Sequence, residues 1–460
     1  MEKIERIKMK ENKILFISAN KHVVPYPVYP IGLSYISTYL KENLPHYEFK
    51  MVDLNFNSID ELKQIIGNFN PKYIGISFRN IDDVNSYNRE EFVTHYKNVI
   101  ENIRTVSDAK VIIGGSGFSI FPELMFKKLN PDFGVYGEGE ETLLNLIKLI
   151  DNNEDYSHLS RLVYQKNGTC VFNQNESYFS DLALEFDENL IDFYWEKSGM
   201  LNIQTKRGCP YNCIYCTYPL IEGSKVRTLN PDKIVETLKR LYYNKGIDYV
   251  FFTDSVFNIN NQYNYKLAEK IIESGIKIHW GGYFTFKNLD EDLLKLLKQS
   301  GLQHVEFGTE AISEKCLKTY GKNFTVKDVL EKSELCNKLG IDFAHFLITG
   351  GYGETDETVN ETFENSKLID NSVFFTFVGM RIYPGTKLQQ YAIEEGVIDK
   401  NDDLLMPKYY LSKDVNYDTL KERAYATRKR WVFPDEDTTT ITNKLRARNK
   451  KGPLWEYMTM

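Results

Sequence analysis

Long apolar runs are missing from this sequence, and their absence bears on where the protein works. No stretch of the 460 residues approaches the roughly 18 consecutive apolar residues that a membrane-spanning helix needs. The apolar segment ILFISA near the start is too short for the core of a secretion signal, and the residues before it mix lysines with glutamates. We therefore expect a cytoplasmic protein with no membrane span.

Cysteines are few, and their placement excludes a disulfide-stapled secreted fold. The chain has six cysteines, and three of them fall between residues 209 and 216. The others, Cys170, Cys316 and Cys336, are scattered, and residues 1–169 contain none. This pattern differs from the regularly spaced cysteines of small secreted domains and indicates a reducing compartment.

An excess of positive charge is also missing. The chain has 57 Lys and Arg against 64 Asp and Glu, which gives a net charge of -7. That balance argues against a general polyanion-binding surface, so nucleic acid is not an expected partner. The hydrophobic fraction of 42% and the charged fraction of 26% are those of an ordinary globular protein. A chain of 460 residues exceeds a single core, so we expect two or three domains.

The first 150 residues alternate short apolar runs with amphipathic segments. This alternation predicts a doubly wound, Rossmann-like parallel sheet as a first α/β domain over residues 1–150. Ligands of such sheets bind beyond the carboxyl ends of the strands, where glycines allow close backbone approach. The expected strands are 13–18, 48–54, 73–78, 110–115 and 132–137, and the strand-end glycines are Gly114, Gly115, Gly117, Gly137 and Gly139.

A second alternation over residues 199–400 predicts a partial (β/α)6 barrel of the TIM type, open where a TIM barrel is closed. Its clearest helix starts after Asn230, which can cap it, has Pro231 at its first position and ends at Gly246. The expected strands are 201–205, 249–254, 277–283, 304–310, 342–348 and 374–383.

Two further segments flank this barrel. Residues 151–198 are expected to connect the domains and to contain a hairpin at Asn167 and Gly168, a strong turn signal. Residues 401–460 are expected to form a small, mainly helical C-terminal region. This region is basic between residues 421 and 451, which predicts a solvated helical face or, alternatively, a lid or an edge that contacts phosphate.

The run RGCPYNCIYC, residues 207–216, carries the most specific chemistry of the chain. Cys209, Cys213 and Cys216 fall at the spacing C-x3-C-x2-C directly after the first expected barrel strand. Three such thiolates can hold three irons of a [4Fe-4S] cluster and leave the fourth iron open to a small molecule. Zinc is the alternative metal, but a structural zinc site takes four protein ligands. Because chemistry in such barrels sits at the carboxyl ends of the strands, we expect the cluster over the barrel mouth.

The cysteine run and the later motifs resemble the radical S-adenosylmethionine (radical SAM) superfamily. The segments FFTDSVFN (251–258), FGTEAISEKCLKTYGK (307–322), FLITGGYGETDET (346–358) and RIYPGTKLQQYAIEEG (381–396) follow in the order of that family. The resemblance implies that SAM chelates the open iron and that an electron from the reduced cluster breaks its sulfonium, which gives a 5'-deoxyadenosyl radical. It also implies an electron donor such as flavodoxin or ferredoxin. The SAM contacts that it implies are Tyr215, Asp254, Ser255, Glu310 and Gly350.

The N-terminal domain resembles the cobalamin-binding (B12-binding) domain that is fused to many radical SAM enzymes. The similarity lies in YPIGLSYISTYL, VIIGGSGFS and DFGVYGEGEETLLNL. The D-x-H-x-x-G motif that gives cobalamin a lower axial histidine in other B12 proteins is absent, so we expect no protein histidine as lower ligand, although His22 lies in the corresponding loop. A relic domain that binds nothing is the alternative. The cobalamin contacts that the resemblance implies are Gly114, Gly115, Ser116, Gly117, Tyr136, Gly137, Glu138 and Gly139.

The combination of the two domains resembles the cobalamin-dependent radical SAM enzymes of the class B methyltransferase type. It implies methylation of an unactivated carbon, or of phosphorus, in a small molecule held between the two cofactors, with methylcobalamin as methyl carrier. A related enzyme that rearranges or cyclises its substrate without methylation is one alternative. A non-catalytic SAM or cobalamin sensor is the alternative from outside enzymology.

The cysteine count weighs against two other iron-sulfur classes. A methylthiotransferase needs three further cysteines in its N-terminal domain, and residues 1–169 contain none. An auxiliary cluster would have to use Cys170, Cys316 and Cys336, whose spacing resembles no such site. We expect Cys170 to act as a small buried apolar side chain and Cys336 to pack on a helix face.

Residues that contact the substrate are the least determined part of the sequence. Tyr283, His345 and Tyr383 lie at or near the ends of expected barrel strands, which makes them weak candidates for catalytic contacts. Core packing is the commoner role for each of these residue types. No appendage indicates a macromolecular substrate, and the sequence does not determine the oligomeric state.

Overall fold

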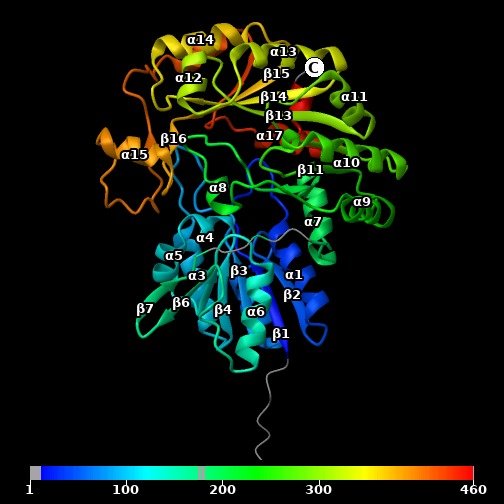
Figure 1. Ribbon diagram of the computed structural model, residues 1–460, viewed down its shortest axis with the longest axis vertical. Helices are drawn as coiled ribbons and strands as arrows, with labels where there is room; N and C mark the ends of the chain where they lie inside the picture. The colour runs from blue at the N-terminus through cyan, green and yellow to red at the C-terminus, as the bar shows by residue number, and fades with distance from the viewer. Residues whose placement is uncertain (1–11, 175–177, 179–181, 459–460) are drawn as a thin grey trace, which may run out of the picture. The chain divides into compact units, whose positions relative to one another are not determined.

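A computed structural model describes residues 12–174, 178 and 182–458 (Figure 1). These residues form two compact units. The first unit takes the residues up to His22, Gly32–Ile81 and the residues from Phe92 to 178. The second takes Val23–Ile31, Asp82–Glu91 and everything from residue 182 onward. Two short loops of the N-terminal half therefore belong to the second unit.

The first unit is built on a seven-stranded sheet of order β2-β1-β3-β4-β5-β6-β7. The first five strands are parallel, as predicted, and the expected hairpin adds two antiparallel strands at the edge next to β5. Asn167 and Gly168 make its turn with φ values of 50° and 79°. The hairpin thus extends the first sheet. The strands are β1 (Lys13–Ser18), β2 (Glu48–Asp53), β3 (Tyr73–Ser77), β4 (Lys110–Gly114), β5 (Phe133–Val135), β6 (Leu162–Lys166) and β7 (Thr169–Phe172).

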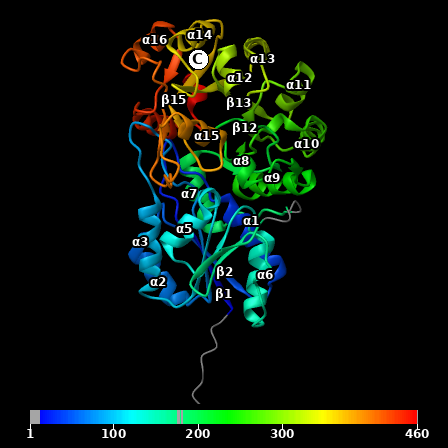
Figure 2. The ribbon, with the colours of Figure 1, turned by 60° about the vertical axis from the view of Figure 1, so that its left-hand side comes forward.

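Helices cover both faces of this sheet, which makes it doubly wound. Figure 2 shows α2, α3 and α5 on one face and α1 and α6 on the other. Local signals start these helices; for example, Ser58 and Glu61 form a reciprocal capping box at α2. The helices are α1 (Ile31–Asn43), α2 (Ile59–Phe69), α3 (Val93–Arg104), α4 (Ser116–Ile120), α5 (Pro122–Leu129) and α6 (Glu140–Asp151).

The second unit is built on a parallel seven-stranded sheet of order β18-β15-β14-β13-β12-β11-β8. The six strands predicted for the partial barrel are present, and a seventh, β18, comes from the C-terminal region and pairs with β15. The strands are β8 (Leu201–Ile203), β11 (Tyr249–Phe252), β12 (His279–Phe284), β13 (Leu302–Glu310), β14 (Asp342–Thr349), β15 (Ser372–Val378) and β18 (Arg430–Val432).

Helices follow the barrel strands in sequence and lie around the outside of the sheet (Figure 2). The central ones are α9 (Pro231–Lys245), α10 (Asn261–Glu273), α11 (Glu291–Gln299), α12 (Glu314–Thr319), α13 (Val326–Leu339) and α14 (Asp356–Ser366). The remaining elements are α7 (Glu188–Ser198), β9 (Lys206–Arg207), α8 (Tyr218–Ile221), β10 (Arg227–Thr228), η1 (Phe257–Ile259), β16 (Met380–Arg381), α15 (Lys387–Glu394), β17 (Tyr409–Tyr410), α16 (Leu420–Ala426), α17 (Thr439–Ala447) and η2 (Trp455–Met458).

Trp455, in the last helical turn that the structure describes, packs inside the barrel. Trp455 forms a buried cluster with Ala344, Val373 and Val432, and its indole nitrogen donates to Glu306 Oε1 at 2.9 Å. The expected C-terminal lid therefore lies, at these residues, against the inner face of the sheet and not over its mouth.

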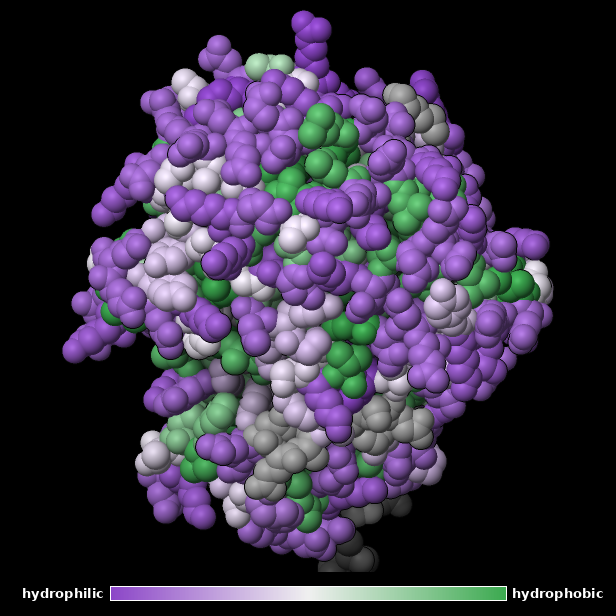
Figure 3. Space-filling view, turned by 45° about the horizontal axis from the view of Figure 1, so that its top comes forward, coloured by the Kyte–Doolittle hydropathy of each residue, from purple (hydrophilic) through white to green (hydrophobic). Residues whose placement is uncertain are grey.

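The surface carries no broad apolar region on the face seen in Figure 3, where apolar side chains form small separate patches. Within the part of the chain that the structure describes, no helix is both long and apolar enough to cross a membrane.

Candidate active site at the cysteine loop

The cysteine run follows β8 and β9 and is fixed at its start by backbone geometry. Gly208 has a φ of +88°, and a side-chain carbon on it would lie 2.2 Å from the carbonyl oxygen of Lys225. Only glycine fits so close an approach with that φ. The amide of Cys209 then donates to the carbonyl of Gly223 at 3.0 Å. The loop therefore leaves β9 in a defined direction.

The far side of the loop is held by two other elements. The amide of Ile214 donates to the Tyr320 carbonyl at 3.1 Å, and its carbonyl accepts from the amide of Leu388 at 2.9 Å. Gly321 has a φ of +74°, and a side-chain carbon on it would lie 2.8 Å from the carbonyl oxygen of Asn212. The turn after α12 and the start of α15 thus hold the loop in place.

The three thiols differ in exposure. Cys209 is buried, whereas Cys213 and Cys216 are half-buried. Among residues 12–174, 178 and 182–458, no three or more His, Cys, Asp or Glu side chains lie close enough to share one metal ion. The ligands of a four-iron cluster need not do so, because each binds a different iron. Three thiols on one anchored loop fit such a cluster.

Asp254 lies directly beneath this loop with both carboxylate oxygens engaged. It accepts hydrogen bonds from the amides of Thr205 at 2.6 Å and Lys206 at 2.9 Å, and its Oδ2 lies 3.0 Å from the Lys206 ammonium. Its side chain is only 1% exposed. Asp254 therefore holds the turn that precedes the cysteines, and its geometry gives no support to the expected contact with the SAM amino group. Neighbouring Ser255 donates to the Gly208 carbonyl at 3.2 Å, so it also supports the loop.

Glu310 and Tyr215 are brought together at the mouth, as the resemblance implied for a SAM site. The Tyr215 hydroxyl donates to Glu310 Oε1 at 2.7 Å. Burial, and then the Glu310 charge, raise the pKa of Tyr215 well above its ordinary value, so the phenol stays protonated. Glu310 has a φ of +63° at an irregularity between β13 and β14. A non-glycine residue in that region is strained, and such strain clusters at functional sites.

Lys322, which the motif analysis did not single out, completes this group. Its ammonium lies 3.1 Å from Glu310 Oε1 and 3.1 Å from the Gly308 carbonyl. Burial opposes the charged form, but the Glu310 carboxylate and the Cys213 thiolate outweigh it and raise the pKa of Lys322. A fixed positive charge therefore faces the cysteine loop. Lys322 closes the motif FGTEAISEKCLKTYGK, which is the signal that could have identified it.

Gly350 lies in the turn after β14 and has little room beside it. It has a φ of +82°, and a side-chain carbon on it would lie 2.3 Å from the Tyr417 hydroxyl. Its amide donates to Glu354 Oε2, and the amide of Gly351 donates to the same oxygen at 3.2 Å. Burial raises the pKa of Glu354 to about 7, against the opposing effect of these two hydrogen bonds.

We expect Glu354 to make stability depend on pH. An unfolded glutamate loses its proton near pH 4.5, whereas folded Glu354 keeps it to about pH 7. The folded state therefore binds more protons between these values, and the free energy of unfolding falls as pH rises, by up to roughly 1.4 kcal/mol per unit. Glu354→Gln should flatten this slope in urea unfolding between pH 5 and about pH 7.

Exposed Glu357 on the same turn of chain offers the matched control. Glu357→Gln removes an exposed carboxylate three residues away and so controls for the change in net charge alone. An unchanged slope in Glu354→Gln would contradict the assignment.

The three weak candidates for catalytic contacts lie in different surroundings. His345 is fully buried. Its Nδ1 shares a hydrogen bond with the Thr309 hydroxyl at 2.8 Å, and its Nε2 lies 3.2 Å from the Ser333 hydroxyl of α13. His345 therefore packs on the face of the sheet that the helices cover. Burial lowers its pKa to about 3. Tyr283 is 39% exposed on β12. The Tyr383 ring lies 4.8 Å from the Arg381 guanidinium.

A second candidate edge lies in the first unit, at the carboxyl ends of β1, β3 and β4. Strand order reverses between β1 and β3, which marks the ligand crevice of a doubly wound sheet. A side-chain carbon on Gly115 would lie 2.7 Å from the Phe78 carbonyl oxygen, and one on Gly117 would lie 3.0 Å from it. Ser116 donates to the Arg79 carbonyl at 2.8 Å. These residues bring α4 close to the end of β3, a packing need that exists with or without a ligand.

The other residues of this edge are held in the same way. A side-chain carbon on Gly114 would lie 3.0 Å from a β5 carbonyl oxygen. Gly137 has a φ of +68°, and its amide donates to the Ser119 hydroxyl at 2.7 Å. Gly139 approaches α1, since a side-chain carbon on it would lie 3.3 Å from Ile36. The glycines after β4 and β5 are thus drawn to one edge.

Tyr136 and Glu138 flank these glycines. The Tyr136 ring stacks on Phe172 with centroids 4.5 Å apart, and its hydroxyl donates to the Asn173 carbonyl at 2.8 Å. Glu138 is 8% exposed and lies 3.8 Å from the Arg161 guanidinium. Both side chains have protein partners, so this structure gives them a structural role.

Two family models match the chain in consecutive segments. The B12 binding domain matches residues 17–147, and the radical SAM superfamily matches residues 203–365. An uncharacterized methyltransferase of Pyrococcus horikoshii is 28% identical over 410 residues, which is 85% of this chain and 85% of that protein. The anaerobic magnesium-protoporphyrin IX monomethyl ester cyclase of Rubrivivax gelatinosus is 25% identical over 377 residues, or 77% of this chain and 65% of the cyclase.

A solved structure has the same fold over almost the whole chain. The radical SAM methyltransferase TsrM from Kitasatospora setae, with tryptophan substrate and a SAM analog bound, aligns over 97% of both chains with a TM-score of 0.87 and 21% identity. The chain belongs to the cobalamin-dependent radical SAM enzyme family.

The cofactors of this cobalamin-dependent radical SAM enzyme are a [4Fe-4S] cluster, SAM and cobalamin. The predictions of fold and family are confirmed. The predicted residue contacts to the cofactors stay predictions, and the geometry ranks them. Tyr215 and Glu310 meet at the mouth beside the cysteine loop, whereas Asp254 and Ser255 lie beneath that loop.

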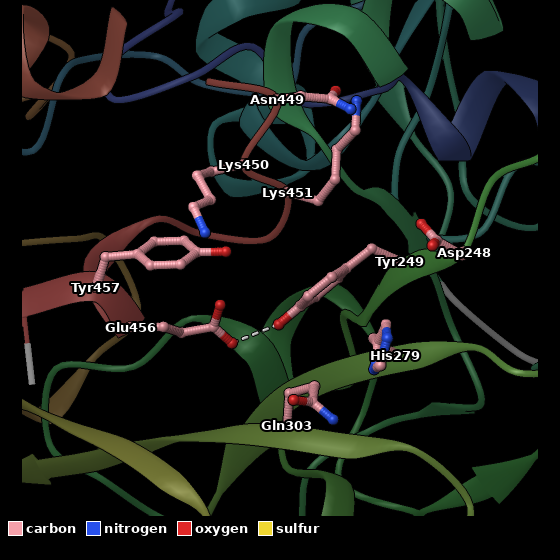
Figure 4. Close-up of a pocket in the computed structure, with 9 residues that line it drawn as sticks. All are labelled: Asp248, Tyr249, His279, Gln303, Asn449, Lys450, Lys451, Glu456 and Tyr457. Carbon is pink, nitrogen blue, oxygen red and sulfur yellow. Dashed lines mark hydrogen bonds between the residues drawn. The ribbon is translucent and has the colours of Figure 1, made fainter. Parts of the chain in front are cut away.

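A hollow of about 330 Å³ lies at the opposite end of this radical SAM barrel (Figure 4). The Tyr249 hydroxyl beside it donates to Glu456 Oε1 at 2.5 Å, and His304 Nδ1 lies 2.8 Å from the same oxygen. The hollow therefore forms where residues of the C-terminal region pack against the barrel. It is lined by Asp248, Tyr249, His279 and Gln303 near the amino ends of strands and by Asn449, Lys450, Lys451, Glu456 and Tyr457.

Proposed function

We propose that this enzyme transfers a methyl group from cobalamin to an unactivated carbon, or to phosphorus, of a small molecule. The observation that carries the proposal is the match over 85% of both chains to an uncharacterized methyltransferase. A methyltransferase that binds tryptophan also shares its fold. Bound together, SAM and the reduced cluster supply a radical for hydrogen removal, and cobalamin supplies the methyl group.

The residues of the mouth have defined tasks in this proposal. Cys209, Cys213 and Cys216 hold the cluster. Tyr215 and Glu310, with Gly350 in the next turn, contact SAM. The hydrogen bond from Tyr215 and the ion pair with Lys322 hold the Glu310 carboxylate in one orientation before SAM arrives. Such preorganisation reduces the entropy lost on binding.

The proposal places the substrate at the mouth of the barrel. Trp455 and the partly buried Phe346, Phe375 and Met458 pack on the inner face of the sheet. The carboxyl ends of the strands are also where chemistry occurs in barrels of this kind. Tyr283, half-exposed on β12 and in edge contact with Phe251 at 4.9 Å, is our proposed substrate contact. This arrangement supports a small substrate.

The glycine edge of the first unit is the proposed cobalamin site. Gly114, Gly115, Gly117, Gly137 and Gly139 bring the backbone to this edge, which suits close approach of a large planar ligand. His22 lies near it in sequence, but its ring packs 5.9 Å from that of Phe92. We therefore keep the proposal that no protein histidine binds the lower face of the cobalt. We also keep the cytoplasm as the proposed compartment, because free thiols are needed at the cysteine loop.

Anaerobic purification with cobalamin tests the proposed function. We expect four irons and one cobalt per chain, and SAM turned over to 5'-deoxyadenosine and S-adenosylhomocysteine in the presence of reductant. Cobalt well below one per chain in cobalamin-replete protein would contradict methyl transfer from cobalamin. An intact cluster that yields neither SAM product would contradict the enzymatic proposal as a whole.

A second candidate function has one specific observation in its favour. The magnesium-protoporphyrin cyclase relative carries a name that describes ring closure and not methylation. If this chain catalyses such a rearrangement or cyclisation, SAM will give 5'-deoxyadenosine without S-adenosylhomocysteine. The ratio of these two products therefore distinguishes the two functions.

A further inference from the structure

We propose that the inner faces of β14 and β15 bind the substrate of this enzyme through a flat, uncharged aromatic ring system. The inference rests on the proposed function, because it names the class of small molecule on which the methyl transfer acts. We call the inward-facing side chains of these two strands beyond Ala344 and Val373 the aromatic wall. Its members are Phe346, Ile348, Phe375 and Phe377.

The register of the two strands shows that the aromatic wall faces the inside of the barrel. Ala344 and Val373 pair with each other and form a buried cluster with Trp455. Side chains two and four residues further along the same strands lie on the same face. The aromatic wall therefore faces inward and runs from Trp455 to the carboxyl ends of the strands. Its two pairs are Phe346 with Phe375 and Ile348 with Phe377.

The aromatic wall is only partly covered by protein. Phe377 is 39% exposed, and Phe346, Ile348 and Phe375 are half-buried. By contrast, Phe374 on the helix-covered face of β15 is fully buried. Inward-facing side chains of a closed barrel normally fill its interior. The uncovered rings therefore leave apolar area that a ligand can bury, which is a favourable contribution to binding.

Two glycines show where the inner face is filled and where it is open. A side-chain carbon on Gly281 would lie 2.0 Å from the ring of His304, so this deeper level is filled. Gly308 pairs with Phe346 of the aromatic wall. A side-chain carbon on Gly308 would have one group within 4 Å among the described residues, chain neighbours apart, which is the Glu310 carboxylate at 3.4 Å. A glycine in such a strand allows close approach of a ligand.

Aromatic rings dominate this part of the inner face and favour a flat ligand. The rings of Phe346 and Phe375 stack, with centroids 5.1 Å apart and an angle of 15° between their planes. On β12, at the other side of β13, the half-exposed ring of Tyr283 lies on the same face. Aromatic pairs gain stability from stacked and edge contacts beyond the area that they bury. A flat aromatic ligand makes such contacts, and a saturated ligand of equal size does not.

The aromatic wall offers nothing to a charged group. None of its four side chains has a polar atom, and a charge that is buried without a partner costs free energy. The carboxylates of β13 and the charged groups that most closely follow β14 and β15 already bind protein partners. We therefore expect the part of the substrate that lies against the wall to be uncharged. The partners are Trp455 for Glu306, Lys322 for Glu310, the amides of Gly350 and Gly351 for Glu354, and Asp82 for Arg381.

Calorimetric titration with three probes tests the proposal. The protein is reconstituted with cluster and cobalamin and supplied with SAM but no reductant, so that nothing turns over. We expect the flat, uncharged probe 2-naphthol to bind saturably at one site per chain. Its saturated counterpart decahydro-2-naphthol should bind about fivefold more weakly, because it lacks the ring contacts. The anion 2-naphthoate should bind at least about tenfold more weakly, because its carboxylate has no partner at the wall. Equal binding of all three probes would overturn the proposal.

Phe377→Leu tests the location of the binding site, because it keeps an apolar side chain on the aromatic wall and removes a ring. Affinity for 2-naphthol should fall about fivefold, whereas affinity for decahydro-2-naphthol should stay the same. Phe56→Leu is the matched control, since Phe56 lies in the first unit and is also 39% exposed. It should leave both affinities unchanged. An equal fall in the two variants, or no fall in Phe377→Leu, would overturn the assignment to the wall.

Iron content and SAM cleavage separate a failure of this inference from a failure of the proposed function. Phe377→Leu should keep the iron content of the natural protein; if it does not, Phe377→Tyr, which keeps the ring, must restore both iron and 2-naphthol binding or the proposal fails. Natural protein that cleaves SAM with dithionite but does not bind 2-naphthol would overturn the inference alone. Natural protein that binds 2-naphthol but yields no SAM product with dithionite would instead contradict the proposed function.

Discussion

Replacing Cys213 with alanine will remove the cluster and with it SAM cleavage. Cys213 is one of three thiols on a loop that is anchored at both ends, so no other cysteine of that loop can take its place. Changes to the outer partners of a metal site cost about 10 to 100-fold in affinity or activity. Loss of a direct ligand should therefore exceed roughly 100-fold in SAM cleavage. Iron per chain and the rate of product formation after anaerobic reconstitution measure the two effects.

Cys170 provides the matched control for this substitution. It is a half-buried free thiol on β7 of the first unit. Cys170→Ala should retain iron and activity close to those of the natural protein. Full iron content in Cys213→Ala would contradict the assignment of the cluster ligands.

Elements with strong local signals are those that the sequence predicts best. Helix α9 begins after Asn230, whose side chain accepts from the amide of Asp232, and it ends at Gly246 with a φ of +65°. Capping chemistry of this kind acts within one turn, so it can be read from neighbouring residues. The hairpin at Asn167 and Gly168 is predicted for the same reason, since both residues tolerate positive φ.

Elements that depend on partners far away in the sequence cannot be predicted from neighbouring residues. Strand β18 is only three residues long, and nothing in its own sequence indicates that it pairs with β15. Trp455 and Glu456 are held by hydrogen bonds to the inner face of the barrel. The Trp455 indole donates to Glu306, and Glu456 accepts from Tyr249 and shares a hydrogen bond with His304. Those partners lie at least 149 residues away in the chain. The prediction of a C-terminal lid could not foresee this.

The candidate site shows the same difference between local signals and arrangements that depend on distant residues. The cysteine spacing is local and identifies the loop, and the family motifs place Tyr215 and Glu310 beside it. Asp254 was assigned to SAM from its motif alone. That contact stays a prediction. In the structure the Asp254 carboxylate binds Thr205 and Lys206, an arrangement that depends on how the strands pack and not on the motif.

Lys206 and Asp254 form a buried ion pair on which the cysteine loop rests. The Lys206 side chain is 2% exposed, and its ammonium also donates to Thr205 Oγ1 at 2.8 Å and to Asn264 Oδ1 at 2.9 Å. The ring of Phe257 lies 4.2 Å from the same nitrogen. Burial lowers the pKa of Lys206, and the Asp254 carboxylate opposes that shift. Removing the carboxylate alone would leave an ammonium group in the core with no counter-charge.

Asp254→Asn should therefore destabilise the protein by about 3–5 kcal/mol, the usual cost of breaking a buried pair by removing one partner. Replacing both charges of such a pair is often close to neutral. The double variant Lys206→Met with Asp254→Asn should accordingly be more stable than Asp254→Asn alone, because it leaves no buried ammonium group without a counter-charge. Urea unfolding of the natural protein, Lys206→Met, Asp254→Asn and the double variant gives the coupling free energy between the two side chains, which should be at least about 1 kcal/mol.

The same variants connect stability to the cluster. The amides of Thr205 and Lys206 bind Asp254 immediately before the cysteine run, so Asp254→Asn should loosen the loop and lower the iron content per chain. If the double variant restores stability and iron together, the pair acts by holding the turn. If Asp254→Asn keeps full stability but loses affinity for SAM, the carboxylate contacts SAM as its motif implied, and the structural role assigned to it here is wrong.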